Sequence, residues 1–273
     1  MTSFLTILTG TGALFNVVTG FTQLTGNLTV IVDSWNHCLR AVNPRTGETS
    51  VYAGRCRKSG YADGPLIGKA AFYRPLAIAS YKGQLFVTDY RNHALRLLTE
   101  GRVSTIIKDP SVLPYPLGLT FTDGFAFITS PSQGLLRLDL LTKSVTKLTN
   151  RTGPAGSLSA AQLSDPRGLA FLSPSVLLIA NWAKNWLLLA NIRNNTITEI
   201  CDGTRATKDG DIRSCQLYGP LSVLMVNQSV YVGQRAAIRR LPVAALSEFI
   251  LRVETTRATP CENAPRYHIV IPL

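Results

Sequence analysis

A short phrase between residues 33 and 40, D-S-W-N-H-C-L-R, holds residue types that can bind a metal or perform acid–base chemistry. Zinc requires three or four converging Cys, His or carboxylate ligands. The chain contains only three histidines, so a three-histidine zinc site would have to join His37, His93 and His268. No H-E-x-x-H, G-x-S-x-G or P-loop pattern occurs, which leaves no indicated nucleophile or phosphate-binding loop. We therefore expect no cofactor and no enzymatic activity.

The phrase is written twice, because residues 89 to 96 read D-Y-R-N-H-A-L-R. Repetition of polar residues at one spacing favours a structural role, an Asp–Arg or Asn–His hydrogen bond between neighbouring strands. The arginines predicted to share one position on the third strand of each repeat are Arg40, Arg96, Arg137 and Arg239. Cys38 is not repeated, since the second copy has Ala94 at that place.

The repeated phrase belongs to a longer pattern of four short strands with alternating apolar residues, separated by turn signals. The pattern is predicted over residues 15–53, 75–107, 116–149, 166–200 and 220–250. The residue that ends the second strand of each repeat is Asp33, Asp89, Ser130, Asn181 and Gln234 in turn. Their spacing is close to the roughly 40–50 residues of a four-stranded propeller blade. The sequence thus predicts an all-β propeller of four-stranded antiparallel blades.

The two ends of the chain are expected to complete this architecture. Residues 1–12 read as a strand that closes the last blade, and residues 251–273 as a C-terminal extension or part of a degenerate sixth blade. S-E-F-I-L-R-V, residues 247–253, and Y-H-I-V-I-P-L, residues 267–273, would supply strands of that sixth blade. We expect residues 1–273 to form a single propeller domain.

The motifs N-H-C-L-R and N-H-A-L-R, with the connecting segment of residues 53–75, resemble the NHL repeat. The resemblance is strong over residues 28–107, weaker to about residue 243, and implies a β-propeller, commonly of six blades. The last three repeats depart from it, reading Gln133-Gly134, Lys184-Asn185 and Ala236-Ala237 in place of Asn-His. A role that needs a histidine in every blade is therefore excluded.

The resemblance implies two further functions as alternatives to a recognition module. Some NHL proteins are cytosolic RNA-binding propellers, which would use a basic face with aromatic residues for base stacking. Peptidyl-hydroxyglycine amidating lyases on this fold hold zinc with three histidines, so a lyase-like enzyme is a weaker alternative.

The five cysteines bear on the redox compartment in which the protein folds. Cys38 opens a third strand and Cys56 follows the fourth, so an antiparallel hairpin brings them together. Cys201 has Cys215 fourteen residues on, within its own connection. We predict the bridges 38–56 and 201–215, each contributing roughly 3 kcal/mol, although reduced thiols in a cytosolic protein remain the alternative. Cys261 is left free or paired with another domain or chain.

Four N-glycosylation sequons fall in predicted loops or turns, at Asn27, Asn150, Asn194 and Asn227. Together with two bridges they favour an extracellular or luminal protein, secreted or the ectodomain of a larger one. No apolar run approaches the roughly 18–20 residues that span a bilayer. The N-terminal segment M-T-S-F-L-T-I-L-T-G lacks basic residues, so no signal peptide is evident.

The formal net charge of +12 is typical of a protein with an anionic partner, such as nucleic acid, a membrane surface or an acidic polysaccharide, with solubility alone as the alternative explanation. The long connections between repeats, with the turns from second to third strand, lie at one end of the blades and are rich in basic residues. The predicted binding residues are Arg55, Arg57, Lys58, Arg74, Arg91, Lys184, Arg205, Lys208, Arg213 and Arg235. We expect a non-enzymatic recognition module that binds a protein or an acidic polysaccharide. Nucleic acid would be a partner only if the protein were cytosolic.

Overall fold

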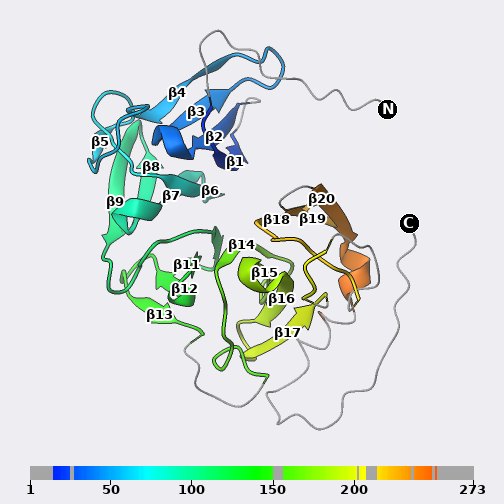
Figure 1. Ribbon diagram of the computed structural model, residues 1–273. Coiled ribbons are helices and arrows are strands. Elements are labelled where there is room, and N and C mark those ends of the chain that lie inside the picture. The colour runs from blue at the N-terminus through cyan, green and yellow to red at the C-terminus, as the bar shows by residue number, and fades with distance from the viewer. Residues whose placement is uncertain are drawn as a thin grey trace. The chain divides into compact units, whose positions relative to one another are not determined.

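The computed structural model describes residues 15–24, 28–149, 156–201, 203–206, 214–234, 237–247 and 250. Its contacts divide the chain into two compact units, Met1–Leu119 and Thr120–Leu273. Strands dominate both units and form five antiparallel sheets, which correspond in order to the five predicted repeats (Figure 1). We call these sheets blades 1 to 5.

The first unit contains blades 1 and 2. Blade 1 has the order β1 (Val18–Gln23), β2 (Thr29–Asp33), β3 (Cys38–Val42) and β4 (Thr49–Gly54). Blade 2 has the order β6 (Pro75–Tyr81), β7 (Gln84–Asp89), β8 (Ala94–Thr99) and β9 (Arg102–Lys108), with β5 (Gly64–Pro65) added beside β9. Single-turn 3-10 helices, η1 (Ser34–Asn36) and η2 (Tyr90–Asn92), connect the second strand of each blade to the third.

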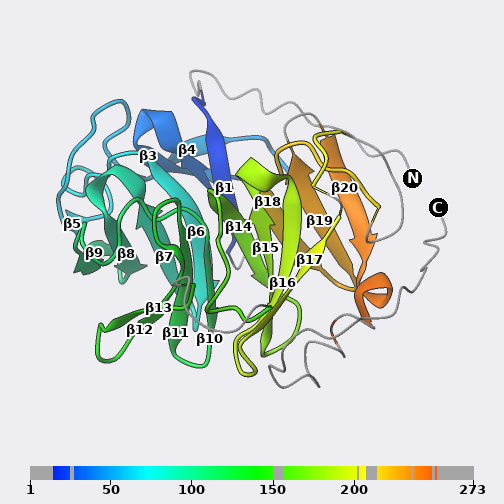
Figure 2. The same cartoon turned by 60° about the horizontal axis from the view of Figure 1, so that its bottom comes forward.

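The second unit contains the remaining blades, the first of which begins at the boundary between the units. Blade 3 has β10 (Leu119–Thr122), β11 (Phe125–Ser130), β12 (Gly134–Asp139) and β13 (Val145–Lys147). Blade 4 has β14 (Pro166–Phe171), β15 (Val176–Asn181), η3 (Trp182–Lys184), β16 (Trp186–Asn191) and β17 (Thr196–Ile200). Blade 5 has β18 (Ser222–Val226), β19 (Ser229–Gln234) and β20 (Ala237–Pro242), followed by η4 (Val243–Leu246). Figure 2 turns the strands of these blades toward the viewer.

Alternating side chains of each strand build the apolar core between consecutive blades. In the first unit, Val30 and Val32 of β2 are fully buried and share a cluster with Val87 of β7 and Phe72 of the connection. In the second unit, Leu177 and Ile179 of blade 4 lie in the cluster that faces blade 3, and its Leu178 in the cluster that faces blade 5. Because successive strand residues point to opposite faces, a blade between two others buries both faces and reads as nearly continuous apolar sequence.

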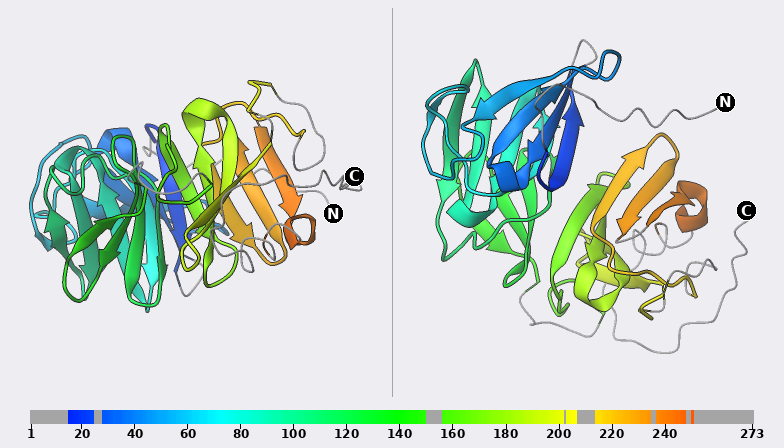
Figure 3. Two further views of the ribbon diagram at one scale, coloured as in Figure 1. Left: turned by 90° about the horizontal axis from the view of Figure 1, so that it is seen from below. Right: turned by 45° about the horizontal axis from the view of Figure 1, so that its top comes forward.

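The first strands of consecutive blades approach closely where one of them carries a glycine. A Cβ added to Gly20 of β1 would lie 2.9 Å from the carbonyl oxygen of Leu76 in β6, and one added to Gly168 of β14 would lie 2.5 Å from Cα of Ser222 in β18. Backbone hydrogen bonding also joins the second pair, from the N–H of Gly168 to the carbonyl of Leu221 at 3.0 Å. These glycines allow neighbouring blades to pack within each unit (Figure 3).

The predicted position of Arg137 is wrong by one residue. Arg96 pairs with Val87 and Arg239 with Val232, each two residues before the end of the second strand. In blade 3 the residue in that register is Leu136, which pairs with Ile128, while Arg137 pairs with Phe127. The strands β11 and β12 pair from Ser130 to Gly134, so their connection is one residue shorter than that of blade 2, and a one-residue slip turns each side chain to the other face. Arg137 instead lies 4.9 Å from the ring centre of Phe125.

The predicted sixth blade is not supported at its first proposed strand. Ser247 and Ile250 are helical, so extended structure at the start of S-E-F-I-L-R-V is wrong. The proposed closing strand of residues 1–12 and the segment of residues 251–273 lie outside the described residues. In the part of the chain that is described, no helix is long and apolar enough to cross a membrane.

Candidate functional site

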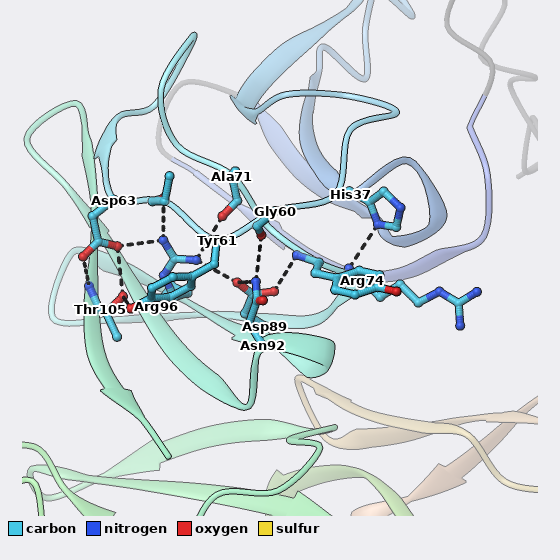
Figure 4. Close-up of polar contacts among 12 residues, drawn as sticks. His37, Gly60, Tyr61, Asp63, Ala71, Arg74, Asp89, Asn92, Arg96 and Thr105 are labelled. Carbon is cyan, nitrogen blue, oxygen red and sulfur yellow. Dashed lines mark hydrogen bonds and ion pairs between the residues drawn. The ribbon is translucent and has the colours of Figure 1, made fainter. Parts of the chain in front are cut away.

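The repeated polar residues of blade 2 form a buried network around Asp89, at the end of β7 (Figure 4). One carboxylate oxygen, Oδ2, accepts hydrogen bonds from Nδ2 of Asn92 at 2.8 Å and from Nη1 of Arg96 at 2.7 Å. The other, Oδ1, accepts from the backbone N–H of Tyr73 at 2.8 Å. Both Asp89 and Arg96 are fully buried. Burial raises the pKa of the Asp89 carboxyl, and the hydrogen bond from Asn92 and the nearby charge of Arg96 oppose that shift.

The guanidinium of Arg96 ties the long connection between blades 1 and 2 to the sheet. It donates to the carbonyls of Ala71 and Ala62, at 3.1 and 2.7 Å, and to Oδ1 of Asp63 at 2.7 Å. The Asp63 carboxylate also accepts from the backbone N–H and the hydroxyl of Thr105 in β9. This confirms the Asp–Arg alternative of the two predicted hydrogen bonds, and the network is structural because every polar partner belongs to the blade or its connection.

Blade 1 repeats the network in a looser form. Oδ2 of Asp33 accepts from Nδ2 of Asn36 at 2.9 Å, but Nε of Arg40 lies 3.9 Å away. Nη1 of Arg40 is 3.8 Å from Sγ of Cys56, within reach of the disulfide. A backbone N–H sixteen or seventeen residues upstream donates to the residue that ends the second strand in blades 1, 2, 4 and 5, where the acceptors are Asp33, Asp89, Asn181 and Gln234.

The two histidines of the repeat are backbone acceptors. Nδ1 of His37 accepts from the N–H of Arg74 at 3.1 Å, and Nδ1 of His93 accepts from the N–H of Tyr115 at 3.1 Å. In blade 4 the same place is taken by Asn185, whose Oδ1 accepts from Gly219 at 2.9 Å. Burial lowers the pKa of both histidines, and the positive charge of Arg74 beside His37 and of Arg91 beside His93 lowers it further. Both rings are therefore neutral at physiological pH.

These hydrogen bonds hold the residue before three of the four prolines at the blade entries. Arg74, Tyr115 and Gly219 precede Pro75, Pro116 and Pro220 and have φ of 51°, 48° and 57°. Residues before proline disfavour the helical region, and non-glycine residues rarely adopt positive φ. In blades 1, 2 and 4 the turn residue thus fixes the residue that precedes the following proline, and His37 sets the direction in which the Arg74 side chain leaves the backbone (Figure 4).

Exposed and half-buried basic and aromatic side chains surround this entry in the first unit. The guanidinium of Arg74 lies 4.1 Å from the ring centre of Trp35, which is 49% exposed. The guanidinium of Arg91 lies 5.3 Å from the ring centre of Tyr90 and 5.7 Å from that of Tyr115. We call the basic residues of these loops the cationic loop face of the first unit, comprising Arg55, Arg57, Lys58, Arg74 and Arg91.

The carboxylates near this face are already engaged with the fold. Asp33 and Asp89 are fully buried within their blades, and Asp63 is paired with Arg96. Within the described part of the chain, no ion pair involves any residue of the cationic loop face. Four of the five residues are exposed and Arg74 is half-buried. A guanidinium stacked on an aromatic ring, as in Arg74 and Arg91, keeps its N–H edge open for a carboxylate or sulfate.

The second unit places two of the predicted binding residues beside aromatic rings of its own. Exposed Lys184 lies 5.8 Å from the ring centre of Trp186, and Arg205 donates a hydrogen bond of 2.5 Å to the hydroxyl of Tyr218. Lys208, Arg213 and Arg235 lie outside the described residues. Sequence reasoning missed Arg167, whose guanidinium lies 4.7 Å from the ring centre of Trp182, and Lys108, which lies 3.5 Å from that of Tyr61. Arg167 directly follows Pro166, which opens β14, and this position could have identified it from the sequence.

Both predicted disulfides form in the structure. Cys38 is joined to Cys56, and Cys201 to Cys215, with Cα–Cα distances of 5.0 and 4.6 Å. The first links the start of β3 to the beginning of the basic connection that carries Arg55 and Arg57. Cys261 lies outside the described residues.

Two of the four sequons lie among the described residues. Asn227 is exposed in the turn between β18 and β19, and Asn194 is partly buried in the turn between β16 and β17. Asn27 and Asn150 lie outside the described residues.

The geometry does not assemble a zinc site from the histidines that are described. Nδ1 of His37 and of His93 are each occupied by a backbone donor of the same unit. Across the described ranges, no group of three or more His, Cys, Asp and Glu is placed to hold a metal ion. His268 lies outside the described residues.

Neither a search of protein-family models nor one of curated proteins found a match to this chain. Solved structures do match, with 14–16% sequence identity, and they show the fold. A nidogen/laminin complex aligns with a TM-score of 0.60 at 14% identity, covering 84% of this chain and 77% of that one.

A catalytically inactive variant of virginiamycin B lyase from Staphylococcus aureus, with quinupristin, aligns with a TM-score of 0.54 at 16% identity, covering 82% of this chain and 66% of that one. These neighbours are β-propellers, so the fold class is an all-β propeller with five described blades. Because one neighbour is a lyase and the other is complexed with laminin, the fold is compatible with an enzyme and with a protein-binding module alike.

Proposed function

We propose that this chain is a single extracellular propeller domain that recognises an anionic partner, a protein or an acidic glycan, and has no enzymatic activity of its own. The observation that carries the proposal is the cationic loop face of the first unit. Its arginines and lysine project from loops at one end of rigid blades, where binding residues tend to be placed. Arginine together with tryptophan and tyrosine is also the composition of energetically dominant interface residues.

Two features support an extracellular setting. The disulfides Cys38–Cys56 and Cys201–Cys215 are typical of proteins that fold in an oxidising compartment. The sequon at Asn227 occupies an exposed hairpin turn, which suits a glycan acceptor. The similarity to a propeller solved in complex with laminin agrees with a role in protein recognition.

The partner's chemistry follows from the loop side chains. A guanidinium binds carboxylate or sulfate through two parallel hydrogen bonds, and stacking on a ring restricts its motion before the partner arrives. Trp35 and Tyr90 supply flat apolar surface next to those groups. A partner that presents anionic groups next to apolar surface fits this arrangement better than a uniformly apolar one.

The test measures binding of the secreted, disulfide-bonded protein to heparin, polyglutamate and a single-stranded RNA. Heparin stands for an acidic glycan, polyglutamate for an acidic protein surface, and RNA for the cytosolic alternative. In the first variant, Arg55, Arg57 and Lys58 are replaced by glutamate. A matched variant, R45E/K82E/R102E, makes the same change of net charge at turns on the other end of the same strands.

We expect the loop variant to bind heparin or polyglutamate about tenfold more weakly, since each exposed ion pair contributes roughly 0.2–1 kcal/mol. The matched variant should retain binding much closer to the original, because its charges are far from the contact and screened by salt. Equal losses in both variants would mean that only net charge matters and would reject the loop face. RNA bound more tightly than both other ligands would favour the cytosolic alternative.

A further inference from the structure

Blade 4 contains a cavity of about 400 Å³, within the usual range of roughly 300–1,000 Å³ for small-molecule sites. It lies between the loop of residues 156–163 and the strands β15, β16 and β17 of the same unit. Its walls include Asn181, Trp186, Leu188 and Ile197, and it reaches the surface at exposed Glu199.

The cavity occupies the place that a guanidinium fills in blade 2. Leu188 pairs with Ile179, two residues before the end of the second strand, and Arg96 pairs with Val87 in the same register. The fully buried guanidinium of Arg96 supplies donors to Asp89 and to two carbonyls of the connection. A leucine side chain is shorter and apolar, so in blade 4 neither the volume nor the hydrogen bonds of that guanidinium are replaced.

Asn181 has a buried amide nitrogen, Nδ2, that has no hydrogen-bond partner among the described residues. Its Oδ1 accepts from the N–H of Ser164 at 2.9 Å, as Oδ1 of Asp89 does from Tyr73 at 2.8 Å. Its Nδ2 is buried without a hydrogen bond, although Asn181 is fully buried and lines the cavity. A buried donor without an acceptor destabilises the fold, and a ligand acceptor in the cavity would remove that cost.

The other walls define what such a ligand must carry. Glu199, opposite Leu188 on β17, offers carboxylate acceptors at the mouth. Desolvation raises the pKa of Glu199, while the charge of Lys184 opposes that shift. The indole of Trp186 supplies an aromatic wall, held in place by Gly203, where an added Cβ would overlap it. With φ of 76°, Gly203 also needs the freedom of a glycine at that position.

We propose that this cavity binds a neutral pyranose, either a free sugar or a glycan end. A sugar hydroxyl can accept from Nδ2 of Asn181 and another can donate to Glu199, while the C–H face of the ring packs on Trp186. A guanidinium or ammonium group has no acceptor for Asn181, and a carboxylate or phosphate meets the like charge of Glu199. The cavity shares no residue with the cationic loop face of the first unit, and the proposal does not depend on the function proposed for that face.

The experiment follows the Trp186 indole N–H in nitrogen-edited NMR spectra of the intact, disulfide-bonded chain. Neutral methyl pyranosides are titrated alongside methylguanidinium, acetate and acetamide, and a W186F variant identifies the indole peak. An N181D variant keeps the acceptor for Ser164, as Asp33 and Asp89 do in their blades, but removes the donor. The variant N181D/L188R restores the Asp–Arg pair of blade 2 and fills the cavity.

We expect one or more pyranosides to shift the Trp186 peak saturably and the comparators to leave it unmoved. N181D should weaken that binding about tenfold, as expected for one buried hydrogen bond, and N181D/L188R should abolish it while the chain stays folded by circular dichroism. Failure of every pyranoside at tens of millimolar, unchanged affinity in N181D, or tighter binding of a comparator would each overturn the proposal.

Discussion

Replacing Arg96 with leucine tests whether the buried pair of Arg96 and Asp89 holds the connection to blade 2. The substitution removes donors to Asp89, Asp63 and the carbonyls of Ala62 and Ala71. It leaves the Asp89 carboxylate fully buried without its cation. Removing one partner of a buried ion pair costs about 3–5 kcal/mol, so we expect the free energy of unfolding to fall by about 4 kcal/mol.

Blade 4 supplies the matched control, because it carries Asn181 and Leu188 at the corresponding positions. The double variant D89N/R96L copies that arrangement and leaves no uncompensated charge. Its remaining costs are a smaller side chain and an amide with fewer partners, about 2–3 kcal/mol together. The double variant should therefore be more stable than R96L alone, although it carries one more substitution.

The pH dependence of R96L provides a second readout. Burial already raises the pKa of Asp89, and loss of the opposing charge of Arg96 raises it further. A carboxyl whose folded pKa lies above its unfolded value destabilises the fold when ionised. This destabilisation is complete above the folded pKa and diminishes as the pH falls from the folded pKa toward the unfolded one. The difference in free energy of unfolding between the parent and R96L should become smaller between about pH 7.5 and about pH 4.5. The corresponding difference for D89N/R96L should change much less.

The assay is urea unfolding by circular dichroism, with hydrogen–deuterium exchange of peptides from β7 and β8 to localise the effect to the first unit. If R96L unfolded at the same urea concentration as the parent, or if D89N/R96L were less stable than R96L, the network would not act as a buried pair. That result would refute the reasoning from burial and hydrogen bonding.

Three further predictions address the histidines, the disulfides and the sequons. Because the pKa values of His37 and His93 are lowered in the folded state, the unfolded chain binds protons at a higher pH than the folded chain does. The free energy of unfolding should therefore be highest above about pH 6.5 and fall as the pH is lowered. In urea unfolding, the variant H37N/H93N should show a smaller fall. Asparagine is chosen because Asn185 already performs the same role in blade 4. Serine in place of Cys38 or Cys201 should lower the free energy of unfolding by about 3 kcal/mol each, as measured against the parent without reductant. Glycosidase treatment of protein secreted from eukaryotic cells should reduce the mass of the peptide containing Asn227, and a peptide of unchanged mass would count against the extracellular proposal.

Much of the fold could be predicted because the strands of each blade follow from sequence patterns within that blade. The prolines at positions 75 and 166 start first strands, and Asp33 and Asn181 end second strands as expected. The disulfides were predictable because an antiparallel hairpin brings Cys38 and Cys56 to the same end. These features depend on short-range spacing, which a sequence displays directly.

The site was less predictable because it depends on register and on contacts between distant segments. A connection one residue shorter turns Arg137 away from the position of Arg96, although the aligned letters are the same. His37 accepts a hydrogen bond from the N–H of Arg74, which is thirty-seven residues away, and no local sequence pattern predicts that hydrogen bond. In the sequence, Leu188 looks like any other apolar strand residue. The cavity is recognised only when the strand pairing shows that Leu188 occupies the position that Arg96 has in blade 2.

The central claim is that the repeat's polar residues build the blades while the loop cations recognise the partner. The most direct measurement compares the dissociation constants of two variants for whichever of heparin and polyglutamate the parent protein binds. We predict about a tenfold increase for R55E/R57E/K58E and no change for H37N/H93N at pH 7.5. A loss of binding in H37N/H93N with retained binding in the loop variant would contradict the claim.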